Sequence, residues 1–491
     1  MAHHEFSRRN FFFGTLLAGA VPSAGFGSTP SLQKAGYKSP NERLNIAAIG
    51  AGGRAEIDIA GFATENIVAF ADPDDKRAGP SFQKYPKASR FRDFRRMLDK
   101  ESKNIDAVLV CTPDHTHAVA AAACMQLGKH VYIEKPLTHS IWEARFLAET
   151  AAKYKVATQM GNQGYSSEGE RIASEIIWSG EIGNVTEVHA WTDRPIWPQG
   201  IAALPAEEKV PDTLDWDVWL GPAAMRPYSS AYAPFAWRGW FDFGCGALGD
   251  IACHALGAAN MALQLDAPVG VEVLKQEGKN THTFPKSSVI RYDFAARGPM
   301  PPVKIFWYDG AKGPAYRPAG IPEDDPLISG TDSFGEAGVM YTGLGPRGGP
   351  NTSVFSRGAS VGGAGVPLAS RREDASGAIF VGDKGFLTAD NYGANIRLLP
   401  KSRHAEYKLP PQFLTRSPGH YQDWIRACKG GDSACSNLAV SGPFTEWVLL
   451  GALAVHFDGK LEWDSPKMRV TNVAEANNYI KPKFRKGWQL G

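Results

Sequence analysis

The sequence has little of three features that would each indicate a particular class of protein. It contains six cysteines in 491 residues and its formal net charge is +2. After residue 30, no apolar run approaches the roughly 20 residues that a membrane-spanning helix needs. So few cysteines exclude a core built on a framework of disulfides, and the balanced charge gives no electrostatic reason to expect a nucleic-acid partner. We therefore expect a globular chain with two or more domains.

The N-terminal segment resembles an export signal. Arg8 and Arg9 precede a weakly apolar run that is rich in glycine and alanine. This layout is typical of Tat signals, which direct folded proteins out of the cytoplasm; the alternative is a basic tail in which two arginines occur by chance. We expect residues 1–30 to be a Tat-type signal, residues 31–43 to be an N-terminal arm, and the protein to be periplasmic or otherwise extracytoplasmic.

Residues 44–160 alternate strand and helix patterns, which is typical of a parallel, doubly wound α/β sheet. Each expected strand is a short apolar run that leads into a polar or glycine-containing turn. The strands are expected within residues 44–49, 66–72, 105–113, 129–136 and 155–161.

After Gly161 the pattern changes, and we expect residues 161–470 to form an α+β domain with a mostly antiparallel sheet. Residues 309–373 are rich in glycine and have little periodicity, so they form an insertion that covers a face, contacts a neighbouring subunit or is partly mobile. Residues 471–491 form a basic tail. A disulfide between Cys428 and Cys435, which bracket a short loop, is possible but not required.

A glycine-rich turn follows the first expected strand. It reads Gly50-Ala51-Gly52-Gly53-Arg54 and is followed by a small alanine that lets a helix pack closely on the sheet. Such a turn brings backbone and a helix N-terminus close to a pyrophosphate. Asp72 ends the second strand about 20 residues on, where an acid binds a ribose hydroxyl and favours NAD over NADP; Lys76 and Arg77 lie close by and weaken that preference.

Two further strand ends carry polar residues. The stretch Cys111-Thr112-Pro113-Asp114-His115-Thr116-His117 could suggest a metal, but no second ligand group stands out, and we expect no metal site. Ligands bind at the carboxyl ends of such parallel strands, so we expect Thr112, Pro113 and His117 to line the cofactor pocket instead. The next strand runs directly into Glu134-Lys135-Pro136.

These strand ends, together with the glycine turn, resemble the Gfo/Idh/MocA oxidoreductases, the family of glucose–fructose oxidoreductase and inositol dehydrogenase. A second family signature is also present, a glycine run at Gly244 and Gly246 followed by Asp250 and, one helical turn later, His254. The resemblance implies an N-terminal Rossmann NAD-binding domain and a C-terminal α/β domain with a large, open, mostly antiparallel sheet. It also implies a homodimer or homotetramer assembled through that sheet.

The spacing of Asp250 and His254 has a physical reading of its own. Residues at i and i+4 share one face of a helix. A nearby acid stabilises the protonated form of a histidine, whereas burial destabilises it, and this balance favours a group that exchanges protons near neutral pH. The resemblance implies that Lys135 and His254 share proton transfer and that Asp250 orients the substrate or the histidine. It also places Glu134 and Gln163 near the nicotinamide.

The start of the second domain and a tryptophan-rich stretch supply candidate substrate contacts. The resemblance places substrate-binding residues at Asn162 and Tyr165. Trp237 and Arg238 precede the glycine run, and aromatic faces suit the C–H faces of sugars while arginine suits a hydroxyl or carboxylate.

These features indicate an exported, NAD-dependent oxidoreductase that acts on a sugar or glycoside. Because no nicotinamide pool recycles the cofactor outside the cytoplasm, we expect NAD to be tightly bound and returned to its starting state in each cycle. A redox-neutral, NAD-dependent glycosidase would use the same residues. A non-catalytic sugar-binding protein with a vestigial cofactor site is the third interpretation, but such a protein would not need all of Lys135, Asp250 and His254.

Overall fold

The computed structural model describes residues 42–329, 332–335 and 373–490. The predicted Tat-type signal and most of the predicted arm lie outside the described residues, as does much of the predicted insertion. Among the described residues, no helix combines the length and the apolar character that a membrane crossing requires.

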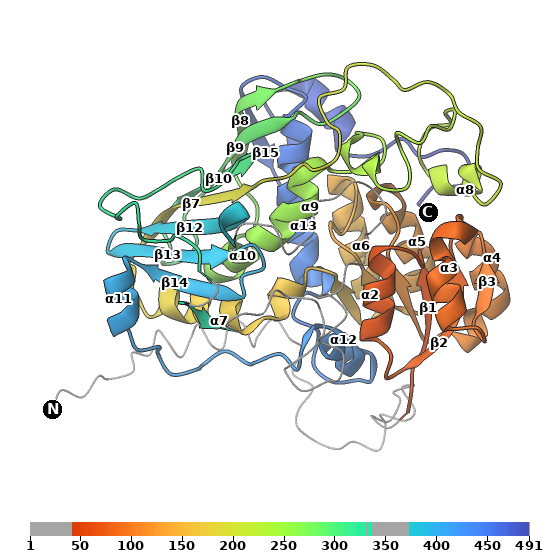
Figure 1. The fold of residues 1–491 in the computed structure, drawn as a ribbon, viewed down its shortest axis with the longest axis horizontal. Helices are drawn as coiled ribbons and strands as arrows, with labels where there is room; N and C mark the ends of the chain where they lie inside the picture. The colour runs from red at the N-terminus through yellow and green to blue at the C-terminus, as the bar shows by residue number, and fades with distance from the viewer. Residues whose placement is uncertain (1–41, 330–331, 336–372, 491) are drawn as a thin grey trace. The chain divides into compact units, whose positions relative to one another are not determined.

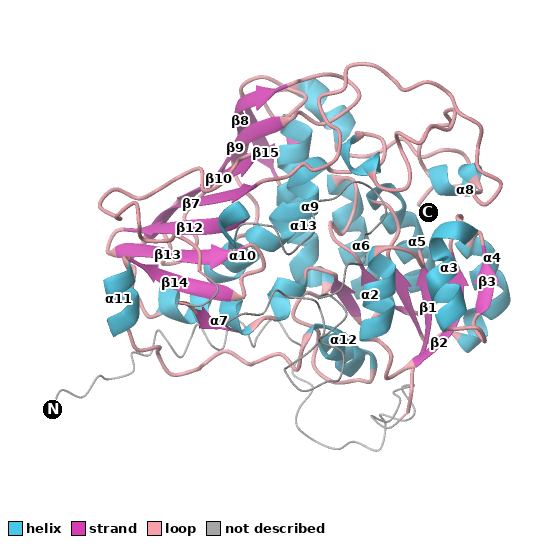
Figure 2. Cartoon of the chain, in the orientation of Figure 1, coloured by secondary structure: helices cyan, strands magenta, loops and turns pink. Residues whose placement is uncertain are grey.

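The N-terminal part is a six-stranded, wholly parallel sheet in the order β3-β2-β1-β4-β5-β6. Helices alternate with its strands, as the sequence pattern predicts (Figures 1 and 2). The strands are β1 (Asn45–Ile49), β2 (Asn66–Ala71), β3 (Ser89–Phe91), β4 (Ala107–Val110), β5 (His130–Ile133) and β6 (Thr158–Met160). The helices are α2 (Arg54–Gly61), α3 (Asp75–Lys84), α4 (Phe94–Glu101), α5 (Asp114–Gln126) and α6 (Ile141–Tyr154).

The second sheet has ten strands in the order β11-β14-β13-β12-β7-β10-β9-β8-β15-β16. Only its β7–β10 pair is parallel among the described pairings (Figure 2). Its strands are β7 (Val185–Thr192), β8 (Gly270–Glu277), β9 (Ser287–Phe294), β10 (Val303–Asp309), β11 (Phe334–Gly335), β12 (Ser376–Gly382), β13 (Gly385–Asp390), β14 (Asn395–Leu399), β15 (Lys460–Asp464) and β16 (Arg469–Val470). The accompanying helices are α7 (Glu168–Trp178), α8 (Trp216–Leu220), α9 (Gly246–Ala255), α10 (Gly257–Ala262), α11 (Lys401–Glu406), α12 (His420–Cys428) and α13 (Leu438–Ala454).

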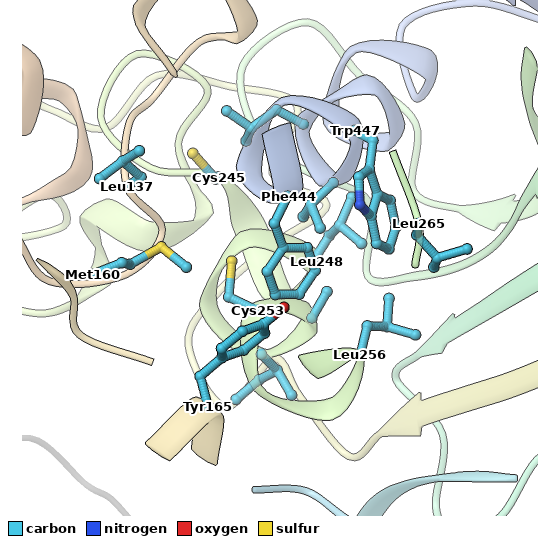
Figure 3. Packing of buried hydrophobic residues seen from close by; sticks show 14 of the residues in the cluster. Leu137, Met160, Tyr165, Cys245, Leu248, Cys253, Leu256, Leu265, Phe444 and Trp447 are labelled. Atoms are coloured by element: carbon cyan, nitrogen blue, oxygen red, sulfur yellow. The ribbon is translucent and has the colours of Figure 1, made fainter. Parts of the chain in front are cut away.

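One continuous core joins the two sheets and fixes α9, the helix that carries Asp250 and His254. Helix α13 contacts α6 of the parallel domain as well as α9 and β8 of the second domain. Figure 3 shows Leu248, Phe444 and Trp447 packed together in this core, where each is almost fully buried. Burying a side chain of this size contributes about 1.5–3 kcal/mol, so α9 is held firmly relative to the strand ends.

The described start of the glycine-rich segment covers one face of the second sheet. Ile321, Leu327 and Ile328 pack on Trp191 of β7, and the ring centroid of Tyr316 lies 3.9 Å from that of His189. The same stretch thereby shields apolar strand residues that would otherwise face water.

Candidate active site

The turn between β1 and α2 requires glycine for steric reasons. Gly50 has a φ of +84°, and a Cβ at this position would lie 2.6 Å from the carbonyl oxygen of Cys111 at the end of β4. A Cβ on Gly52 would lie 2.3 Å from the Arg77 carbonyl oxygen. The turn therefore passes close to two neighbouring loops, and it lies between a strand end and a helix N-terminus, where this fold binds a pyrophosphate.

Asp72, at the end of β2, organises the loops beside this turn. Its carboxylate accepts hydrogen bonds from the backbone N–H of Ala51 at 2.8 Å and of Asp74 at 2.9 Å. Burial raises the pKa of Asp72 to about 6, although both backbone hydrogen bonds oppose the rise. Asp72 is therefore charged at neutral pH and sits where the sequence predicts an acceptor for a ribose hydroxyl.

A cavity of about 330 Å³ extends from the glycine turn to α9. It contains most of the residues that the sequence predicts for the cofactor and for catalysis. The predicted residues that line it are Gly50, Gly52, Arg54, Asp72, Thr112, Pro113, Glu134, Lys135, Gln163, Trp237, Arg238, Asp250 and His254.

Lys135 and Asp250 form an ion pair that joins the end of β5 to α9. Lys135 Nζ lies 2.9 Å from Asp250 Oδ1 and also donates to the Asp250 backbone carbonyl at 2.6 Å. Both side chains are about 85% buried, with relative exposures of 14% and 15%. Arg238 Nε lies 3.3 Å from the same carboxylate oxygen. The Asp250 carboxylate thus holds two positive groups of the cavity, Lys135 and Arg238, in fixed positions.

The charge state of Asp250 follows from this arrangement. Burial would raise its pKa, but the nearby charges of Lys135, Arg238 and Arg194 together hold the pKa of Asp250 below its ordinary value. The carboxylate is therefore ionised at neutral pH.

The pKa of His254 lies lower than the expected balance between burial and an acidic neighbour would give. Its ring is 4% exposed, and within the described chain Nδ1 is buried without a hydrogen-bond partner. Burial and the charge of Lys135 lower the pKa of His254 well below its ordinary value, despite the opposing charge of Asp250. The imidazole is therefore neutral at pH 7, because burial and the charge of Lys135 outweigh the charge of Asp250.

Glu134 directly precedes Lys135 in the chain, but its carboxylate contacts Gln163 and Arg54. Its Oε1 accepts from Gln163 Nε2 at 3.2 Å and lies 3.5 Å from Arg54 Nε. Gly161 follows β6, and a Cβ there would lie 2.4 Å from the same oxygen. Glu134, Gln163 and Arg54 thus form one polar wall between the glycine turn and Lys135.

Three predicted site residues do not line the cavity. His117 places Nδ1 2.9 Å from the Pro136 carbonyl oxygen and Nε2 2.9 Å from that of Thr112, so it joins the two strand-end loops. Tyr165 accepts a hydrogen bond from Asn260 Nδ2 at 2.8 Å and packs in the core. Asn162 accepts from Ser436 Oγ at 2.5 Å.

Two residues of the turn also fall outside the cavity lining. Ala51 is fully buried and contributes its N–H to Asp72. Gly53 has a φ of +68°, and its N–H donates to Glu56 at the start of α2. Both shape the turn rather than face the cavity.

The structure adds cavity residues that the sequence did not reveal. Phe235 lies against Arg238, whose guanidinium carbon is 4.7 Å from the Phe235 ring and 4.3 Å from the Trp237 ring. Tyr392 comes from the loop after β13, and its ring centroid lies 4.8 Å from that of His254. Trp488 comes from the C-terminal tail. Tyr392 and Trp488 reach the cavity from segments far away in the sequence, and Phe235 lies just before the predicted Trp237 and Arg238.

Cys428 and Cys435 are free thiols. Cys428 packs in the core behind the parallel sheet, and Cys435 Sγ accepts a hydrogen bond from Arg171 at 2.8 Å.

The cavity residues fit a dinucleotide. The glycine turn leaves no room for side chains, Asp72 is placed at the adjacent strand end, and Thr112 Oγ1 is buried without a partner among the described residues. A buried hydroxyl without a partner costs free energy unless a ligand satisfies it. These three observations agree with a cofactor that lies along the strand ends.

Comparisons with known proteins identify the family of both domains. Residues 44–162 match the family model for the NAD-binding Rossmann fold of an oxidoreductase family, and residues 179–296 match the model for the same family's C-terminal alpha/beta domain.

The curated relatives match over part of their length. The chain is 25% identical over 173 residues to 4-carboxy-2-hydroxymuconate-6-semialdehyde dehydrogenase of Sphingobium sp.. This match covers 32% of this chain and 54% of the relative. It is 27% identical over 164 residues to inositol 2-dehydrogenase of Rubrobacter xylanophilus, and this match covers 31% of this chain and 45% of the relative. The chain thus spans about half the length of these relatives.

A solved structure shows the same fold over most of the chain. The WlbA dehydrogenase from Bordetella pertussis, crystallised in complex with NADH and UDP-GlcNAcA, aligns with a TM-score of 0.55 at 12% identity. The alignment covers 86% of this chain and 99% of that protein. The two family models, which match residues 44–162 and 179–296, assign the chain to the Gfo/Idh/MocA family of oxidoreductases, with an NAD-binding Rossmann domain.

Proposed function

We propose that the protein is an NAD-dependent oxidoreductase that transfers a hydride between a ring carbon of a sugar or glycoside and a tightly bound nicotinamide. One observation supports this most strongly. An ionised Lys135–Asp250 pair and a neutral His254 meet in the cavity that continues from the glycine turn of an NAD-binding domain.

Oxidation of an alcohol requires a hydride acceptor, a proton acceptor and stabilisation of negative charge on oxygen, and the site offers a group for each. Bound NAD would supply the hydride acceptor. His254 is neutral, so it is in the form that can accept the hydroxyl proton. The Lys135 ammonium, fixed by Asp250, stabilises the negative charge that develops on the substrate oxygen.

The walls of the cavity suit a sugar. Trp237, Phe235 and Tyr392 present aromatic faces of the kind that pack on C–H groups of a ring. Arg238 can donate to a hydroxyl or a carboxylate because Asp250 and the Phe235 carbonyl occupy only part of its donor set. An inositol dehydrogenase, whose substrate is a cyclic polyol, is among the relatives.

We further propose that the protein is exported by its Tat-type N-terminus and forms a homodimer or homotetramer. Folding before export would allow the chain to leave the cytoplasm with NAD already bound. Fractionation of a producing cell, together with light scattering of the purified protein, tests both points. A cytoplasmic monomer would contradict them.

The reaction is tested with a panel of free hexoses, uronic acids, myo-inositol and aryl glycosides, scored for both NADH absorbance and release of aglycone. We expect at least one sugar or glycoside to produce an NADH signal. Release of aglycone without net NADH would replace this function by a redox-neutral glycosidase. If no compound is turned over and the protein binds no nicotinamide nucleotide, the proposed function is wrong.

A further inference from the structure

Two segments far apart in the sequence meet over the Asp72 end of the cavity. One is residues 213–222, which include α8, and the other is residues 485–488 of the C-terminal tail; together we call them the clasp. Both contribute to the cavity lining, through Val218 and Trp219 from the first segment and Trp488 from the second. Trp219 and Trp488 are 7% and 6% exposed.

Backbone hydrogen bonds attach the first segment to the loop that follows Asp72. The N–H of Asp75 donates to the Thr213 carbonyl at 3.0 Å, and the N–H of Asp215 donates to the Pro73 carbonyl at 2.8 Å. Because these bonds lie within three residues of Asp72, the segment crosses the cavity where the adenosine ribose of a dinucleotide binds in this fold.

The tail is attached both to the first segment and to the parallel domain. Arg485 donates from Nε to the Gly221 carbonyl at 2.8 Å and from its backbone N–H to the Pro222 carbonyl at 3.0 Å. The Trp488 ring lies 3.9 Å from the guanidinium carbon of Arg95 and 6.0 Å, between centroids, from the ring of Phe94. The tail therefore links α4, beside β3, to α8.

Helix α5 provides a third attachment, through His115. The His115 ring lies between two carbonyl oxygens of the second domain, with Nε2 3.2 Å from that of Trp219 and Nδ1 3.3 Å from that of Phe243. Trp219 also stacks on Trp216 at 4.7 Å between ring centroids. The clasp is thus held by the β2–α3 loop, by α4 and by α5, all of which belong to the NAD-binding domain.

We infer that the clasp retains the cofactor: NAD bound along the glycine turn and Asp72 lies beneath residues 213–222 and Trp488, and it leaves only when these segments separate from the parallel domain. This inference rests on the proposed function and names the residues that would make the cofactor resident. It requires that exchange of NAD be slower than turnover and that it be limited by opening of the clasp.

The test measures exchange of bound NAD for added isotope-labelled NAD, followed by mass spectrometry of the nucleotide released on denaturation. Trp488→Ala removes the tail's contact with α4 and the cavity, and we expect it to accelerate exchange at least about tenfold. Trp178→Ala is the matched control, because Trp178 is a partly buried tryptophan that donates to the Ala262 carbonyl and does not line the cavity. We expect its exchange rate to equal that of the unaltered protein.

A second measurement keeps the inference testable if Trp488→Ala does not fold. In the unaltered protein, hydrogen exchange of the amides in residues 213–222 and 485–488 should slow when NAD is bound and accelerate when it is removed. If NAD is bound but neither the variant nor hydrogen exchange responds, the clasp is wrong while the proposed function stands. If the unaltered protein binds no NAD at all, the proposed function itself fails.

Discussion

Asp250→Asn tests the ion pair at the centre of the proposed site. The substitution keeps the shape of the side chain but removes the charge that Lys135 and Arg238 share. At 2.9 Å and an effective dielectric constant of about 20, the attraction to Lys135 alone is on the order of 6 kcal/mol. Desolvation offsets part of this attraction, and removing one partner of a buried pair typically costs about 3–5 kcal/mol because the other charge stays buried.

We expect Asp250→Asn to lower the melting temperature by several degrees and kcat by about 10²–10³-fold. Bound NAD should be retained, because the substitution leaves the glycine turn and Asp72 unchanged. Thermal denaturation, turnover and nucleotide content after denaturation measure the three effects.

Glu446→Gln is the matched control for this experiment. It breaks another partly buried ion pair, in which Arg145 Nε lies 3.0 Å from Glu446 Oε2, and Glu446 does not line the cavity. The control should lose stability but keep its turnover. If Asp250→Asn behaves like the control, or like the unaltered protein in both assays, the ion pair does not take part in the reaction.

Further predictions concern the other site residues. Lys135→Met and His254→Ala should each reduce turnover sharply while leaving NAD bound; turnover at the unaltered rate would remove that residue from the mechanism. Because burial and Lys135 lower the pKa of His254, the acidic limb of the kcat profile should fall below the ordinary histidine pKa of about 6.5, and a limb at or above that value would contradict a neutral His254. Asp72 loses its charge as the pH falls through about 6, so NAD affinity measured by titration should weaken below that pH; a flat affinity would exclude contact with the ribose. Gly50→Ala introduces a Cβ at 2.6 Å from the Cys111 carbonyl oxygen at a φ of +84°, so it should lose bound NAD, and full occupancy would show that the turn can adjust.

The sequence predicts much of the fold because local pattern and tertiary packing agree in most elements. The apolar runs of β1, β2, β4, β5 and β6 are each followed by a polar or glycine-containing turn, and the parallel sheet contains all five. β3 was missed because Phe91 is its single apolar residue, whereas the stretch that contains β6 also includes Val156 and Ala157.

The site was predictable where a motif carries the chemistry. Gly50 and Asp72 are identified by the spacing of the glycine turn and the next strand end, Lys135 and Asp250 are identified by the family resemblance, and all four line the cavity. His117 lies outside the cavity lining, because its ring lies between two backbone carbonyl oxygens that only the structure shows. The charge state of His254 was not predictable either, since it depends on the burial of the ring and on its nearness to Lys135, which only the tertiary structure shows.

The most direct test of hydride transfer to a resident nicotinamide uses the purified protein with no added cofactor. Each sugar and glycoside of the panel is mixed with it, and reduced nicotinamide is followed by its fluorescence in a single turnover. The structure predicts that a substrate produces a transient or lasting signal of up to one reduced nicotinamide per chain, and that Lys135→Met does not. A protein that contains no nicotinamide, and gives no signal with the panel even when NAD is added, would contradict the proposal.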